Sequence, residues 1–253
     1  MAAAGAFSVI EHVSGLRDLV VRRTARDLVA DKIAQLVAAG ILQVGDLLPS
    51  ERHLAAAFQV SRETVRGSLQ ILAGRGVIEI SQGLRSRVVS TDLGPMAPGV
   101  TETRRINAYA LETVHAARIL VEREVVALAA EGIDRETLAF LEHSLHAQRA
   151  AMDDPVRFLI SDREFHLAIY RACGNPALAD FVGDLYAYMM EFRRRAVSRA
   201  GAISNSVHDH EAILDGLRQH DAEVVVAAFN LHLNRIYQTT RSLLEDQETM
   251  HDG

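Results

Sequence analysis

Apolar side chains recur at helical spacing from Arg104 to near the C-terminus, and only short turns rich in Gly, Pro and Asp interrupt them. Steps of three and four residues place such side chains on one face of a helix. No proline follows Pro176, so the last 77 residues lack the residue that most disrupts helices. We therefore expect residues 104–247 to form an all-helical domain. The predicted helices span 104–131, 134–151, 155–172, 176–199, 206–219 and 221–246.

Residues 25–90 carry a different order of patterns. Helical spacing over 25–39 is followed by two short apolar segments, and Ser50 and Ser61 stand before them as residues suited to capping a helix. Residues that alternate like two strands come next, at 77–80 and 87–89, separated by a turn at Gln82-Gly83. Three helices followed by a hairpin is the order of a winged helix-turn-helix.

The predicted fold class is therefore mainly α, with an N-terminal winged helix-turn-helix and a C-terminal all-α helical bundle. Residues 1–24 show little pattern and are expected to form an N-terminal extension. Residues 91–103 contain two glycines and two prolines, which predicts a linker between the two domains.

The formal net charge of −6 is distributed unevenly along the chain. Residues 1–90 hold 11 Lys and Arg against 8 Asp and Glu, whereas residues 91–253 hold 16 against 25. This division suggests that only the N-terminal part meets a polyanion. Cys173 is the only cysteine, and we find no signal peptide and no apolar stretch long enough to span a bilayer. We expect a cytoplasmic protein without membrane contact.

The second serine-capped segment has the features of a DNA-recognition helix. Such a helix exposes polar side chains at its N-terminal end while its other face packs into the domain. Here Arg62, Thr64 and Arg66 lie in the first turns, and apolar residues follow on the opposite face. Arginine can bind a guanine edge through two hydrogen bonds or hold a phosphate. Arg52 begins the preceding helix and is expected to touch backbone or base.

The predicted turn of the hairpin is small enough to enter a minor groove. Gln82 and Gly83 form its tip, and Arg85 and Arg87 flank it. Each arginine alone could be an ordinary solvated surface charge, but the set lies on one winged-helix pattern. The predicted DNA-binding residues are Arg52, Arg62, Thr64, Arg66, Gln82 and Gly83.

This part of the chain resembles the GntR family of transcriptional regulators over about residues 26–90. The resemblance rests on the segments LPSERHL at 48–54 and VSRETVR at 60–66, followed by Leu69, Leu72 and Gly76. It implies a DNA-binding transcriptional regulator, in which the equivalents of Arg52, Arg62, Arg66 and Gly83 contact DNA. The expected DNA partner is a palindromic operator, bound by a homodimer.

In the C-terminal domain, polar residues interrupt the apolar faces of four predicted helices. They are Arg118, Asp162, His166, His210 and His232. Burial of one such group can reflect an ion pair or a satisfied core histidine, but five on inward faces suggest a shared polar cavity. Asp162 and His166 are one helical turn apart, so both reach the same point. His208 is expected to point away from His210.

Three histidines and one carboxylate form a suitable ligand set for a divalent metal. Zn²⁺ is the first expectation, with Ni²⁺, Mn²⁺ and Fe²⁺ as alternatives. The segments DREFH at 162–166, GNP at 174–176 and HEAIL at 210–214, followed by His232, resemble the FCD ligand-binding domain of the FadR branch of GntR regulators. The resemblance implies that Asp162, His166, His210 and His232 bind one metal per subunit. It also implies that a small carboxylate docks beside the metal and that Arg118 meets this ligand.

The resulting hypothesis is a transcriptional regulator, expected to be a repressor, whose operator affinity depends on a small carboxylate bound at the metal. One alternative is a regulator with a purely structural metal. A second is a metalloenzyme fused to a DNA-binding module, but the sequence places no carboxylate as a general base beside the metal ligands. We therefore expect no enzymatic activity.

Overall fold

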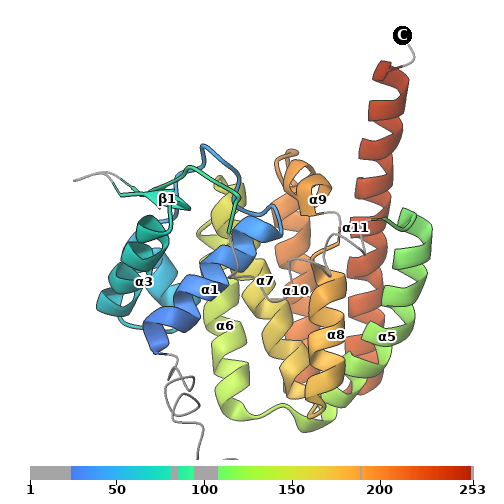
Figure 1. Cartoon of the computed structure of the whole chain (residues 1–253). Helices are drawn as coiled ribbons and strands as arrows, with labels where there is room; N and C mark the ends of the chain where they lie inside the picture. Colours follow the sequence, from blue (N-terminus) through green and yellow to red (C-terminus); the bar gives the residue numbers. More distant parts are fainter. Residues whose placement is uncertain (1–23, 81–84, 94–107, 189, 252–253) are drawn as a thin grey trace, which may run out of the picture.

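The computed structural model describes residues 24–80, 85–93, 108–188 and 190–251. Its N-terminal part contains helices α1 (Ala25–Ala38), α2 (Glu51–Ala57) and α3 (Arg62–Gly74), followed by strands β1 (Ile78–Glu79) and β2 (Arg87–Val88). The strands pair antiparallel, with Ile78 opposite Val88. This is the predicted winged helix-turn-helix order (Figure 1).

Side-chain caps define where the three N-terminal helices begin. The Thr24 hydroxyl accepts a hydrogen bond from the Asp27 amide, and the Asp27 carboxylate accepts one from the Thr24 amide, which forms a capping box at α1. Ser50 and Ser61 cap α2 and α3 as predicted, each accepting from the amide three residues later. These caps satisfy amides that have no partner within their helix.

The segment between α1 and α2 is tied to the wing. The Gly45 amide donates to the carbonyl of Val88 and the Leu48 amide donates to that of Ser86, both at 2.8 Å. The Val88 amide in turn donates to the carbonyl of Asp46 at 2.9 Å. A displacement of Asp46 would therefore also act on strand β2.

The C-terminal part is helical throughout its described residues. Its helices pack side by side, and α7 runs through the middle of the group (Figure 1). Residues on every side of α7 are buried, including Phe158, Asp162, Phe165, His166 and Tyr170. The helices are α5 (Leu111–Gly132), α6 (Arg135–Arg149), α7 (Pro155–Ala172), α8 (Pro176–Tyr186), α9 (Met190–Val197), α10 (Ala202–Arg218) and α11 (Ala222–His251). The predicted mainly α fold, with a winged helix-turn-helix and an all-α bundle, is confirmed.

One predicted helix is wrong, because residues 176–199 form two helices instead of one. The first, α8, ends at Tyr186, and its C-cap Ala187 donates to the carbonyls of Asp184 and Leu185. The buried Tyr188 then donates its hydroxyl to the carbonyl of Tyr109 at 2.8 Å. This break depends on tertiary contacts, and neither Gly nor Pro marks it in the sequence.

Other helix boundaries also differ from prediction. Helix α10 begins at Ala202 instead of 206, after Gly201 with a positive φ of 78°, and α11 continues to His251. The predicted helix 104–131 begins later, at Leu111, because residues 108–110 are described and are not helical. Nearly all of the predicted extension 1–24 and linker 91–103 lies outside the described residues, as do Gln82, Gly83 and residues 104–107. The domain limits at 24, 90, 103 and 247 remain predictions.

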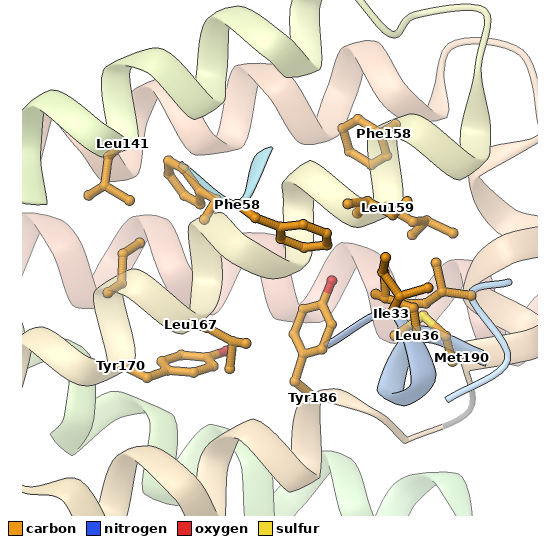
Figure 2. Packing of buried hydrophobic residues seen from close by; sticks show 14 of the residues in the cluster. Ile33, Leu36, Phe58, Leu141, Phe158, Leu159, Leu167, Tyr170, Tyr186 and Met190 are labelled. Carbon is orange, nitrogen blue, oxygen red and sulfur yellow. The ribbon is translucent and has the colours of Figure 1, made fainter. Parts of the chain in front are cut away.

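The winged helix-turn-helix packs directly against the helical bundle. Ile33 and Leu36 of α1 lie beside Met190 of α9, and the ring of Phe58 reaches toward α7 (Figure 2). At the same boundary the Lys32 ammonium forms an ion pair with Glu164 of α7 at 2.7 Å. Buried apolar contacts and charge pairs thus join the two parts of the protein.

Candidate metal centre, ligand cavity and DNA-binding surface

The four predicted metal ligands meet at one buried point of the bundle. Asp162 and His166 come from α7, His210 from α10 and His232 from α11. All four are buried, and one ligand atom from each lies within 4.8 Å of the other three. The helical periodicity that places Asp162 and His166 on one face also places them on the same side of the cluster.

Neighbouring side chains orient two of the histidines. Nδ1 of His210 lies 2.7 Å from Oε1 of Gln148, and Nδ1 of His232 lies 3.3 Å from Oδ2 of Asp209. Because these oxygens accept, both Nδ1 atoms carry the hydrogen, and each Nε2 has a free lone pair directed into the cluster.

The orphaned nitrogens fit a metal ion. In the described part of the chain, Nε2 of His210, Nε2 of His232 and both ring nitrogens of His166 are buried without a hydrogen-bond partner. Such unsatisfied groups are costly to bury. A divalent cation would satisfy one nitrogen of each imidazole, and three imidazoles with one carboxylate are a donor set that zinc and related ions accept.

The protonation states also suit metal binding. Burial lowers the pKa of His166 and His232 and lowers that of His210 to about 3, so these imidazoles are neutral near pH 7. Burial alone would raise the pKa of Asp162, but interactions with His166 and with Arg193 hold it well below its usual value. The cluster therefore offers neutral imidazoles and an ionised carboxylate.

A cavity of about 260 Å³ opens beside the cluster and shares Asp162 and His232 with it. Three guanidinium groups line this cavity, and polar side chains suited to hydroxyl or carboxylate groups stand among them. The lining residues with polar ends, apart from Asp162 and His232, are Arg193, Arg199, Asn205, Ser206, Asp209, Arg235 and Thr239. In this lining Asp162 pairs with Arg193, and Asp209 pairs with Arg235 and His232. Arg199 pairs with the exposed Asp246 outside the lining, so the lining carries one excess positive charge, which favours a small anion.

Arg118 does not line this cavity but a smaller one beside it, which shares Arg193 and Ile236 with it, and Arg118 has a partner within the chain. Its Nε lies 2.6 Å from Oε1 of Glu122 one turn along α5, and Oε2 of Glu122 accepts from the Tyr170 hydroxyl at 2.7 Å. The buried charge of Arg118 is therefore compensated by Glu122, so its burial does not by itself require an anionic ligand. Its role in ligand binding stays a prediction.

Arg193 is a site residue that the sequence analysis missed. Its Nη2 lies 3.1 Å from Oδ2 of Asp162, its Nη1 donates to the carbonyl of Tyr186, and its guanidinium stacks over the Tyr186 ring. The Tyr186 hydroxyl also donates to Asp162. The sequence signal was the run Arg193-Arg194-Arg195, but on one long helix it would be an ordinary exposed charge cluster.

The three expected DNA-binding arginines of α2 and α3 are exposed, and Thr64 is half-buried. Arg62 and Arg66 project from the start of α3, and both approach the Glu51 carboxylate, at 3.8 and 3.2 Å. Arg52 is exposed at the start of α2, while the Thr64 hydroxyl lies 2.9 Å from that of Ser61. Arg62 and Arg66 thus lie together on the face of α3 that meets Glu51 of α2.

His208 is exposed on α10, as expected, and stays outside the metal cluster. None of the helices in the described ranges is long and apolar enough to cross a membrane.

Comparison with known proteins gives the same two-part division. Residues 25–88 match the family described as bacterial regulatory proteins, gntR family, and residues 113–235 match the FCD domain. The HTH-type transcriptional repressor NanR of Cronobacter sakazakii is 28% identical over 235 residues, which cover 90% of each chain. NanR of Salmonella newport is similar to the same extent.

A solved structure, E. coli McbR/YncC, shares the fold with a TM-score of 0.50 and 21% identity. That similarity covers 89% of this chain and 99% of the other. The named relatives are transcriptional repressors, and the matched families are those of regulators, not of enzymes.

Proposed function

Because the chain belongs to the GntR family of bacterial transcriptional regulators and carries an FCD domain, we propose that it is a metal-dependent repressor controlled by a small organic acid. The observation that carries the proposal is the set of buried imidazole nitrogens without partners, beside a cavity lined by arginines. The relatives named as repressors support the direction of control. Such a regulator would act in the bacterial cytoplasm.

The residues proposed to hold the metal are Asp162, His166, His210 and His232, with Zn²⁺ as the first candidate and Ni²⁺, Mn²⁺ or Fe²⁺ as alternatives. A bound divalent ion would supply an electrophilic centre for a carboxylate oxygen. Arg193, Arg199 and Arg235 would neutralise the rest of the ligand, and Asn205, Ser206 and Thr239 would bind its hydroxyl groups. This arrangement favours a hydroxylated carboxylate over an apolar one.

The proposed DNA contacts come from Arg52, Arg62, Thr64 and Arg66, together with Gln82 and Gly83 of the turn that the sequence predicts. One helix-turn-helix provides few base contacts, so we propose that a homodimer reads a palindromic operator. Glu51 holds Arg62 and Arg66 near each other in the free protein. Because these ion pairs are exposed, phosphate or a guanine edge can replace the carboxylate at low cost.

Elemental analysis of protein prepared without chelator or a metal-binding affinity tag tests the metal site. We expect one divalent metal per chain, and we expect His232→Ala to lose it while His208→Ala, which alters an exposed histidine on α10, retains it. Full metal content in His232→Ala would place the site elsewhere.

A screen of small carboxylates tests the effector. Thermal stability of the metal-loaded protein reports binding, since a ligand of the folded state stabilises it. Acids that bind are then added to the protein bound to DNA from upstream of its own gene, and we expect them to release it. If the protein binds metal but no acid changes its stability or its DNA binding, the metal is purely structural and the proposed effector is wrong.

A further inference from the structure

We propose that helix α9 relays occupancy of the metal and ligand site to the DNA-binding domain through the consecutive residues Arg193 and Arg194. This inference rests on the proposed function and assigns its coupling element. Its starting observation is that two neighbouring side chains of one short helix make ion pairs in different domains. Arg193 binds Asp162 in the bundle, and Arg194 binds Asp46 in the winged helix-turn-helix.

The contact of Arg193 makes α9 sensitive to the site. The guanidinium is buried and shares Asp162 with the metal cluster, and it also lines the cavity beside it. A metal that takes electron density from the Asp162 carboxylate weakens its attraction for Arg193. An anion in the cavity offers Arg193 another partner. Both events change the force that holds α9 against α7.

The contact of Arg194 makes the DNA-binding domain sensitive to α9. Both terminal nitrogens of Arg194 bind the Asp46 carboxylate, the Nη2–Oδ1 distance being 2.7 Å, and Nη1 also donates to the carbonyl of Ile41 at 2.8 Å. Such two-pronged arginine–carboxylate pairs are among the stronger and more directional ones. Because Asp46 accepts a backbone hydrogen bond from Val88, its position is linked to strand β2 of the wing.

The helix itself is suited to moving as a unit. Helix α9 spans only Met190–Val197 and is separated from α8 by the turn at Ala187–Tyr188. On its other side, Gly201 with a φ of 78° separates it from α10. Within eight residues, adjacent side chains cannot change position independently when the backbone shifts. A displacement that begins at Arg193 therefore reaches Arg194.

The test uses Zn²⁺ as the probe and hydrogen–deuterium exchange of backbone amides as the readout. Chelator-treated full-length protein is compared with and without Zn²⁺, in the segments 41–48 and 86–88. Coupling between protein sites typically corresponds to a factor of about 5 to 150. We expect the exchange rates of these segments in the unaltered protein to change by at least about fivefold on zinc addition.

Two variants break the Arg194–Asp46 ion pair, one at each partner. They are Arg194→Ala on α9 and Asp46→Asn in the segment between α1 and α2. We expect each to bind Zn²⁺ normally while the exchange of 41–48 and 86–88 no longer responds to it. Arg195→Ala is the matched control, since it removes the next arginine of α9, whose guanidinium lies over the Phe192 ring. This control should keep the full response.

The outcomes separate the relay from the proposed function. If the unaltered protein binds zinc but its 41–48 and 86–88 segments do not respond, the relay is wrong and the metal site stands. A response that persists in both Arg194→Ala and Asp46→Asn also overturns it. If the unaltered protein does not bind zinc at all, the metal site fails and the relay fails with it.

Discussion

Oε1 of Gln148 lies 2.7 Å from Nδ1 of His210, so a side chain of α6 determines which nitrogen of this imidazole faces the metal cluster. Asp209 does the same for His232. Partners of this kind fix the tautomer and raise the basicity of a metal-binding histidine. Neither Gln148 nor Asp209 is among the predicted ligands, yet both are buried beside them.

The first prediction concerns these two partners. We expect Gln148→Leu and Asp209→Ala each to weaken zinc binding by about 10- to 100-fold, because the imidazoles lose their orienting acceptors. Competition with a coloured chelator measures the affinity. Glu211→Gln, on the exposed side of α10, serves as the control. Unchanged affinity in both variants would show that the histidines are held by packing alone.

The second prediction concerns the acid stability of the metal-free protein. Burial lowers the pKa of His210 to about 3 from its usual 6.5, and it lowers the pKa of His166 and His232 as well. At a pH between the lowered pKa of each histidine and 6.5, the imidazole is protonated in the unfolded chain but neutral in the folded protein. Stability is therefore complete above about pH 6.5 and falls as the pH drops, by roughly 1.4 kcal/mol per pH unit for each histidine.

Urea unfolding of chelator-treated protein at several pH values between 4 and 8 measures this effect. Replacing His210 by Gln removes one titrating group. Below pH 6.5 the free energy of unfolding should therefore depend less steeply on pH in this variant. If the variant and the unaltered protein show the same pH dependence of stability, His210 is protonated in the folded protein. Zinc addition should raise the stability most near neutral pH, where protons compete least for the imidazoles.

The third prediction concerns the DNA-binding surface. Arg62→Ala or Arg66→Ala should reduce operator affinity by about 1–3 kcal/mol where the arginine reads a base. Arg123→Ala removes an exposed arginine of α5, distant from the helix-turn-helix, and should leave the affinity unchanged. Fluorescence anisotropy at two salt concentrations separates base from phosphate contacts, because a lost phosphate contact also lowers the salt dependence.

Local patterns in the sequence were sufficient to predict the fold and the four clustered residues. Asp162 and His166 belong to one helix, and the serine caps at 50 and 61 mark helix starts directly. The relation of Arg193 to Asp162 could not be predicted, because it depends on a helix break that tertiary contacts stabilise.

For Arg118 the position was predicted, but its interaction partner was not. Its burial was predicted from the apolar face of α5. Glu122 is one turn further along the same helix, where an acidic residue also fits an exposed ion pair. The spacing alone does not distinguish a buried pair from a solvated one, and the resemblance to the FCD domain implied a ligand as the partner of Arg118.

The last prediction distinguishes the roles of Arg118 and Arg235. Arg118 is buried in an ion pair with Glu122, whereas Arg235 is partly exposed and lines the cavity. We expect Arg118→Ala to destabilise the protein by about 3–5 kcal/mol, because Glu122 would then be buried without its cation. Arg235 also pairs with the buried Asp209, but it is partly exposed and Asp209 keeps its hydrogen bond from His232, so Arg235→Ala should destabilise the protein less than Arg118→Ala. Arg235→Ala should weaken binding of a small carboxylate by about 1.5–3 kcal/mol, as expected for the loss of a charged hydrogen bond. Urea unfolding and calorimetric titration of the acid measure the two effects separately. If Arg118→Ala instead retains its stability and loses affinity for the acid, then Arg118 turns from Glu122 to the ligand, as the resemblance to the FCD domain implies.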